Sequence, residues 1–301
     1  MKRHGWMPLA RACGAILVAV LTLPVAGAAQ GEYREGRDLD RLVARIALYP
    51  DPLLAQVLTA STYADDIPDA DAWANDHRYL HGDALTAAMT DDSVPWDPSI
   101  LALLPFPSVL DRMNGDMQWT HDLGDAVLNN RAEVMDAVQR MRARARDYGY
   151  LRSSPDVRVV FGVGAITILP VRPGYLCVPT YDPAVVFVAP ARRVYRPMVV
   201  FGPPIVIATG FMRFGWVGAA FDWRAHSIII DRRPWERTMV NRATYVHPYE
   251  RPWVRPQRAV GAEHRVERHE VHHDEHVEHH DEHNDQRHDD HRDDHHDDHH
   301  N

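Results

Sequence analysis

The stretch Ile46-Ala-Leu-Tyr-Pro-Asp-Pro-Leu-Leu-Ala-Gln-Val-Leu58 decides the architecture of the first half of this chain. Its two prolines stand where one helix must end and another can begin. Asp51 is a good N-cap residue, and Pro52 fits the first position of the new helix. Apolar residues then recur at helical spacing. They predict one buried stripe, formed by Leu53, Leu54, Val57, Leu58 and Ser61.

Helical patterns continue on both sides of this stretch. Before it, Asp38 precedes apolar residues at i, i+3, i+4 and i+7 from Leu39, which predicts a capped helix. After it, we expect helices near residues 69–79, 83–90, 98–104, 107–113, 118–128 and 130–148. The last helix ends in four cations that complement its dipole, and we expect a solvated helix end. These cations are Arg140, Arg142, Arg144 and Arg146.

The periodicity changes after Pro155. Short apolar, β-branched runs separated by Gly and Pro predict a small sheet. The runs cover residues 157–161, 166–169, 175–178, 185–188, 205–208 and 227–230. Residues 198–221 are long and apolar, but Pro203, Pro204 and Arg213 lie inside them. That favours strands and a Gly-rich turn over a hairpin that touches a membrane.

The N-terminus has the three features of a secretory signal peptide. Lys2 and Arg3 are followed by an apolar run over residues 15–23 and by Ala26 and Ala28, which fit a cleavage site. The run is too short to span a bilayer, so we expect a cleaved signal, no transmembrane helix in the mature chain, and a periplasmic or other extracytoplasmic location. Cleavage would leave Cys177 without a disulfide partner, and we expect it to be a buried small side chain.

We therefore expect an α+β protein: an N-terminal helical bundle, a small β-rich region and a disordered C-terminal tail. The expected segments are a signal peptide (1–29), a helical domain (30–153), a β-rich region (154–241), a Pro/Arg-rich linker (242–261) and a tail rich in His, Asp and Glu (262–301). The tail has too few apolar groups to offset the entropy of ordering it.

Charge alternates along these segments. Residues 31–150 are acidic, with 21 Asp and Glu against 11 Arg. Residues 151–261 are basic, with 6 Asp and Glu against 15 Arg, and residues 262–301 are acidic again, with 15 Asp and Glu against 4 Arg. The basic block also carries aromatic residues, as anion-binding surfaces do. These residues are Arg192, Arg193, Tyr195, Arg196, Arg213, Phe214, Trp216, Trp223 and Arg224. We expect its arginines either to pair with the acidic helices or to meet an anionic envelope component; export argues against nucleic acid.

The tail contains 14 of the 20 histidines and is the clearest candidate for metal chemistry. Its candidate ligands are His269, His272, His276, His279, His283, His288, His291, His295 and His299. The first five are spaced 3, 4, 3 and 4 residues apart, so on a helix they would form chelating pairs for Ni, Zn, Cu or Co. The competing interpretation is a solvated tail with incidental metal affinity, because a tract this rich in histidine produces such spacings by chance.

Other catalytic patterns are rejected or weak, and we assign no catalytic or cofactor-binding residue. The tail matches H-E-x-x-H at His269 and H-x-x-E-H at His272 and His279, but it offers no apolar face to pack as a zinc-protease helix.

In the helical part, Asp65, Asp66, Asp69 and Asp71 lie near Trp73 and His77; we interpret them as helix-start residues. His121 and Asp122 are adjacent on a helix and cannot face each other, so we expect structural roles.

Several blocks resemble a bacterial family, domain of unknown function 3300, over about residues 38–240, with the tail outside the resemblance. They include the opening stretch, Ala60-Ser-Thr-Tyr63, Trp96-Asp-Pro-Ser99, Trp119-Thr-His-Asp-Leu-Gly-Asp-Ala126 and Val178-Pro-Thr-Tyr-Asp-Pro183. The resemblance implies an envelope protein of Gram-negative-type bacteria and implies no activity.

Three functions follow from these observations. The leading hypothesis is a non-enzymatic envelope interaction or scaffold protein whose tail binds divalent metal. An alternative is an envelope hydrolase with its site between the helical and β-rich parts, which predicts a cleft with converging polar groups. The third is a scaffold with an inert tail.

Overall fold

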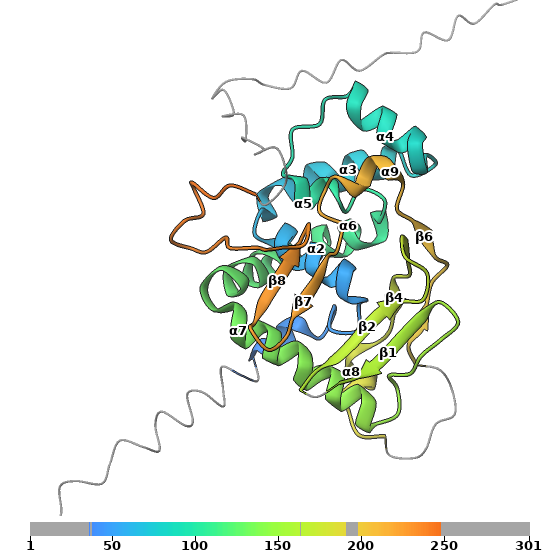
Figure 1. Ribbon diagram of the computed structural model, residues 1–301, viewed down its shortest axis with the longest axis vertical. Coiled ribbons are helices and arrows are strands. Elements are labelled where there is room, and N and C mark those ends of the chain that lie inside the picture. Colours follow the sequence, from blue (N-terminus) through green and yellow to red (C-terminus); the bar gives the residue numbers. More distant parts are fainter. Residues whose placement is uncertain (1–35, 37, 163, 191–197, 248–301) are drawn as a thin grey trace, which may run out of the picture. The chain divides into compact units, whose positions relative to one another are not determined.

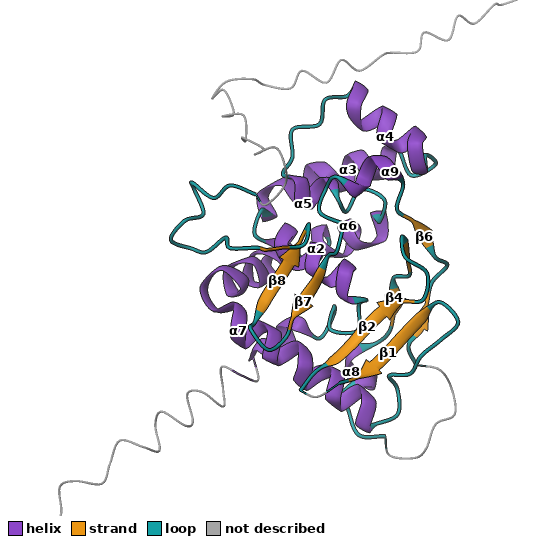
Figure 2. Cartoon of the chain, in the orientation of Figure 1, coloured by secondary structure: helices purple, strands orange, loops and turns teal. Residues whose placement is uncertain are grey.

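The structure is a computed structural model that describes residues 36, 38–162, 164–190 and 198–247 (Figure 1). The chain divides into two units, residues 1–256 and 257–301, and every described residue belongs to the first. Helices occupy the first half of the described chain, and small antiparallel sheets follow (Figure 2). The expected α+β fold class is confirmed.

Residues 38–43 are helical and precede the longer elements. The helices are α2 (Asp51–Ser61), η1 (Ala64–Asp66), α3 (Ile67–Asp76), α4 (Gly82–Asp91), α5 (Pro98–Leu101), α6 (Pro107–Asn114), α7 (Met117–Asp147), α8 (Pro183–Val186) and α9 (Thr209–Met212). The strands are β1 (Val157–Phe161), β2 (Ile166–Pro170), β3 (Tyr175–Leu176), β4 (Pro179–Thr180), β5 (Val200–Phe201), β6 (Ile205–Val206), β7 (Ala220–Asp222), β8 (Ser227–Ile230) and β9 (Arg233–Pro234).

The described strands form four small sheets, all antiparallel. β1 and β2 make a hairpin with Val157 opposite Pro170. β3 pairs with β6 and β4 pairs with β5, while β7, β8 and β9 form a three-stranded sheet in sequence order. None of these sheets is wide enough to enclose a core by itself, so each depends on packing against the helices.

Helix α2 is the centre of the core. Every one of its residues except Pro52 is buried, rather than only the predicted stripe. It contacts α5, α7, β2 and β7, so it has protein on all sides. A helix that is buried all round needs small or apolar residues all round, which explains Ala55 and Ala60 between the larger side chains.

One glycine sets the distance between α2 and α7. A Cβ at Gly124 would overlap the main-chain oxygen of Ser61, the last residue of α2. A backbone atom cannot move aside as a flexible side chain can, so only glycine permits this approach of the two helices. Further along, Asn130 has a non-helical backbone (φ −147°, ψ 65°), which coincides with the predicted boundary between two helices.

The prediction of a solvated cationic end for α7 is wrong at Arg142. This side chain is fully buried, and its guanidinium contacts the Asp51 carboxylate, with Nη1 2.7 Å from Oδ1. It also donates to three main-chain oxygens, those of Ala47 (2.8 Å), Tyr49 (3.0 Å) and Ile166 (2.7 Å). These bonds compensate the guanidinium for the water lost on burial.

Asp51 also differs from its predicted role. Helix α2 begins at Asp51 with Pro50 as the N-cap residue, and no side chain caps it. Besides Arg142, the Asp51 carboxylate accepts hydrogen bonds from the main-chain N–H of Ile168 (3.2 Å) and from Nε1 of Trp223 (3.2 Å). The pair therefore connects α2 and α7 to β2 and to the end of β7.

Two neighbouring arginines are paired as well. Arg140 Nε lies 2.8 Å from Oδ1 of Asp40, and Arg144 Nη2 lies 2.7 Å from its Oδ2. Asp40 is buried, so this contact fixes the 38–43 helix against α7. Arg146 meets only the adjacent, exposed Asp147 and so keeps the predicted solvated character.

Residues 182–188 correct a second prediction. Val185–Val188 was expected to be a strand, but α8 covers Pro183–Val186 and its Asp182 side chain accepts a hydrogen bond from Ala184 N (2.8 Å). Asp182-Pro183 repeats the aspartate-then-proline start seen at Asp97-Pro98, and this capping outweighs the strand preference of three valines.

The long apolar stretch over residues 198–221 contains the strands β5 and β6 and the start of β7, as expected, and also the short helix α9, which was not predicted. Within the described residues, no helix is long and apolar enough to cross a membrane. Cys177 is buried, as expected, and burial raises the pKa of its thiol.

A buried histidine–aspartate pair holds the last described residue. His247 Nε2 lies 3.0 Å from Oδ1 of Asp97, and both side chains are almost completely buried. Oδ1 of Asp97 also accepts hydrogen bonds from the main-chain N–H (2.9 Å) and the hydroxyl (2.7 Å) of Ser99 at the start of α5. Burial alone would raise the pKa of Asp97, but His247 and Ser99 together hold it below its ordinary value.

Replacing Arg142 with methionine should lower the free energy of unfolding by about 3–5 kcal/mol, because Asp51 would remain buried without its cation. Urea unfolding followed by circular dichroism measures the change. The matched control is Arg146→Met, which removes an exposed ion pair and should cost less than about 1 kcal/mol. Equal losses in the two variants would contradict the role assigned to Arg142.

Replacing Asp97 with asparagine should destabilise the protein in a pH-dependent way. A carboxyl group whose pKa is lowered by folding adds stability above its unfolded pKa and loses that contribution as the pH falls through the folded value. The loss in Asp97→Asn should therefore be about 2 kcal/mol near pH 6 and should shrink as the pH is lowered below about 4. Urea titrations at several pH values test this, with the exposed Asp122→Asn as control; a pH-independent difference would contradict it.

Candidate functional site

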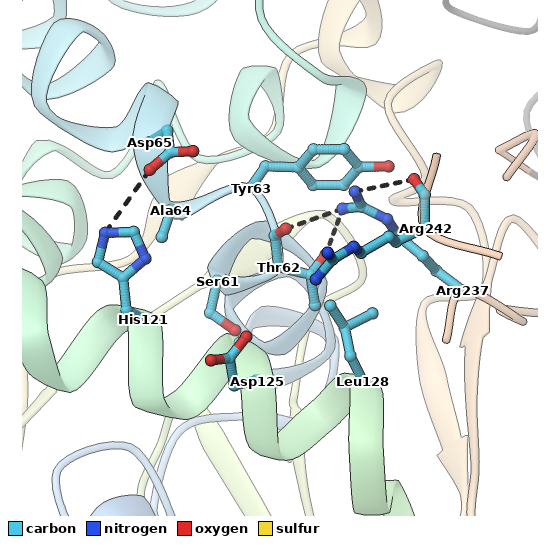
Figure 3. Close-up of a pocket in the computed structure, with 11 residues that line it drawn as sticks. Ser61, Thr62, Tyr63, Ala64, Asp65, His121, Asp125, Leu128, Arg237 and Arg242 are labelled. Atoms are coloured by element: carbon cyan, nitrogen blue, oxygen red, sulfur yellow. Dashed lines mark hydrogen bonds and ion pairs between the residues drawn. The ribbon is translucent and has the colours of Figure 1, made fainter. Parts of the chain in front are cut away.

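A pocket of about 350 Å³ opens where α2 ends; we call it the Thr62 pocket. Its walls come from four parts of the chain: the end of α2 and Thr62, residues 63–65, one face of α7, and the segment after β9 that carries Arg237 and Arg242 (Figure 3). Its volume is at the lower end of the range for small-molecule sites, about 300–1,000 Å³. We treat it as the candidate functional site.

Helix α7 supplies one wall of the pocket through residues at helical spacing. His121, Gly124, Asp125 and Leu128 lie three or four residues apart and so share one face. Gly124 permits the close approach of α2, which places Ser61 and Thr62 directly beside this face. The same glycine that sets the packing of the two helices therefore also shapes the pocket.

The structure joins two candidates that the sequence placed in separate motifs. His121 Nε2 lies 3.7 Å from Oδ1 of Asp65, and Figure 3 shows the two side chains pointing toward each other. Asp122 instead accepts a hydrogen bond from Gln118 (2.8 Å), one turn earlier on the same helix.

The other acidic candidates serve local structure. Asp66 is the N-cap residue of α3 and Asp69 lies in its first turn, so both stand at a helix start as expected, although the Asp66 side chain makes no capping bond. Asp71 accepts from Asn75 (3.2 Å) and Asn114 (2.9 Å). Trp73 stacks on His77, with ring centroids 4.1 Å apart. Within the part of the chain that the structure describes, no cluster of three or more His, Cys, Asp or Glu side chains is suited to hold a metal ion.

Arg237 closes the pocket from the far side, and the sequence did not single it out. Its Nη1 donates to the main-chain oxygen and to Oγ1 of Thr62 (2.9 Å each), and its Nη2 donates to the main-chain oxygen of Arg242 (3.2 Å). The guanidinium lies 3.6 Å from the centre of the Tyr63 ring, in a cation–π contact. Burial and the nearby Asp97 raise the pKa of Tyr63.

The serine and threonine hydroxyls of the pocket donate to main-chain oxygens of α2, the helix at whose end they lie. Ser61 Oγ donates to the main-chain oxygen of Leu58 (2.9 Å), and Thr62 Oγ1 donates to that of Thr59 (2.7 Å). A hydroxyl becomes a nucleophile when a base accepts its proton, and here each proton is directed at a carbonyl oxygen. Among the described residues of the pocket, His121 is hydrogen-bonded to neither hydroxyl.

Among the described arginines of the basic block, the exposed ones do not pair with the acidic helices, which was one of the two expectations for them. Eight of the nine described arginines in residues 151–247 are exposed, and Arg237 is the buried exception. None of those eight forms an ion pair with a described carboxylate of residues 38–150. Arg172 contacts Asp156 (3.5 Å) within the basic block itself, and Arg213 lies over the ring of Phe214.

Three further sequence predictions lie outside the described residues. They concern the signal peptide over 1–29, the basic residues Arg192, Arg193, Tyr195 and Arg196, and all nine tail histidines from His269 to His299.

Comparison with known proteins identifies relatives without a described activity. The chain is 34% identical over 198 residues to the uncharacterized protein YacH of Escherichia coli (strain K12), an alignment that covers 55% of this chain and 31% of YacH. The matched region thus spans about a third of that relative's length. No solved structure matches the chain.

A family described as "protein of unknown function (DUF3300)" matches residues 35–295. The match extends well beyond residue 240, where the resemblance was expected to end, and covers most of the histidine-rich tail. Because it includes far more than half of the sequence, this chain belongs to the DUF3300 family.

Proposed function

We propose that this protein is an extracytoplasmic, non-enzymatic binding protein, in which the folded part is a scaffold and the histidine-rich tail binds divalent metal. The observation that carries the non-enzymatic assignment is the state of the Thr62 pocket: its serine and threonine hydroxyls both donate to main-chain oxygens rather than to its histidine. The alternative, an envelope hydrolase, gains support from the converging polar groups of this pocket, but among the described residues neither its serine nor its threonine hydroxyl donates to a base.

Export is supported by the order of features at the N-terminus: two cations, an apolar run over 15–23, and small residues at Ala26 and Ala28. It would place the exposed arginines where anionic lipids and cell-envelope polymers are the available polyanions.

The export proposal predicts that the chain recovered from the cell envelope lacks its first 29 or so residues. Intact-mass measurement of the protein from fractionated bacteria tests this prediction, with a variant carrying Asp at positions 26 and 28 as a control that blocks cleavage. Recovery of the chain from the cytoplasm with residues 1–29 still attached would contradict it.

Metal binding is supported by ligand type and spacing. His269, His272, His276, His279 and His283 alternate three- and four-residue spacing, which on a helix aligns neighbouring imidazoles on one side. Carboxylates between them can assist as ligands or as second-shell partners. The family match covers these five residues, so they belong to the part of the chain that resembles its relatives.

Two variants with five substitutions each separate ordered chelation from incidental affinity. One replaces these five histidines with asparagine; the control replaces His264, His273, His280, His296 and His300, which are equal in number but lack the alternating spacing. Calorimetric titration with Ni²⁺, Zn²⁺ and Cu²⁺ should show at least about a tenfold weaker affinity in the first variant and a smaller change in the control. Equal losses would indicate incidental binding, and unchanged binding in both would exclude the tail as the metal site.

A further inference from the structure

Two opposite charges line the Thr62 pocket without pairing with each other. Asp125 comes from α7, and Arg242 comes from the segment after β9. Within the described residues, neither side chain forms an ion pair, although both face the same hollow; the Arg242 guanidinium contacts the sulfur of Met239 (2.7 Å). Figure 3 shows the acidic groups Asp65 and Asp125 apart from the two arginines.

Both charges are held in place by the fold. Asp125 is on α7, whose position is set by the contact of Gly124 with Ser61. The main chain of Arg242 accepts a hydrogen bond from Arg237, which is itself bonded to Thr62. The backbone positions of the two charges are therefore set before a ligand arrives, and binding needs to order only their exposed side chains.

The remaining walls limit the size and polarity of the ligand. Tyr63, Ala64 and Leu128 provide apolar surface between the charged groups, and the volume of about 350 Å³ suits a molecule of amino-acid or dipeptide size. A ligand with a single charge would satisfy one side and leave the other side's charge partly desolvated, which is costly.

We infer that the Thr62 pocket binds a small zwitterion, an amino acid or a short peptide, with its ammonium group beside Asp125 and Asp65 and its carboxylate beside Arg242. Arg237 acts as a positioning residue, because its donors hold Thr62 and the main chain of Arg242. This site is in the folded part and is independent of metal binding by the tail.

Dialanine and its two blocked forms test the inference on the full chain. N-acetyl-dialanine lacks the ammonium group, and dialanine amide lacks the carboxylate, while the size changes little. Titration calorimetry or ligand-observed NMR should show saturable binding of dialanine with a Kd in the millimolar range or tighter and at least about tenfold weaker binding of each blocked form.

Two variants assign each end of the ligand. Asp125→Asn should weaken dialanine binding by about tenfold and should leave the affinity for the N-acetyl form unchanged. Arg242→Gln should also weaken dialanine binding by about tenfold, but it should leave the affinity for the amide form unchanged. The matched controls are Asp122→Asn, three residues before Asp125 on α7 and outside the pocket lining, and Arg232→Gln, exposed just before β9; both should bind like the wild-type chain.

The inference is overturned by any of three results: no saturable binding of dialanine, equal affinity for free and blocked peptides, or equal effects of the pocket and control variants. Thermal unfolding of each variant shows that it is folded, so a loss of binding cannot be attributed to a loss of structure. Metal titration of the Asp125→Asn and Arg242→Gln variants should match the wild-type chain, which keeps this test separate from that of the tail.

Discussion

The buried contact between Arg142 and Asp51 is the constraint on which the fold depends. A guanidinium without access to water must have its donors satisfied, and the groups that satisfy them belong to the turn before α2, to α2 itself and to β2. The cation also lies over the ring of Trp223, which follows β7. Because one side chain contacts all these segments, the helices and the small sheets cannot separate without exposing a buried charge.

This requirement explains why sheets of two and three strands suffice. Hairpins of this size are marginal in water, but here β2 contacts both α2 and α7, and β7 and β8 contact α2. The carboxylate of Asp51 accepts the N–H of Ile168 within β2, so an ion pair in the helical part also orients a strand. The contacts that pack the core and the hydrogen bonds that pair its buried polar groups therefore involve the same residues rather than separate regions.

The Thr62 pocket follows from the same packing. Helix α2 ends against the glycine of α7, and the chain after Thr62 must turn away, which leaves a hollow beside the helix end. Arg237 donates to the main-chain oxygen and to Oγ1 of Thr62 at that turn and brings a distant segment against it. The guanidinium of Arg237 thereby supports both Thr62 and the main chain of Arg242 on the pocket wall.

Sequence by itself determined the α+β class, the positions of most helices and strands, the family, and the aspartate–proline start of α5, because these depend on local periodicity and capping. It could not determine that Arg142 is buried while Arg146 is exposed, since both stand near one helix end and only long-range partners distinguish them. The valines within residues 185–188 likewise favour a strand, but the side-chain cap at Asp182 starts a helix there instead. Within the pocket, Asp65 and His121 were noticed separately, but their contact and the role of Arg237 depend on distances between residues up to 175 positions apart, and only the tertiary structure decides those.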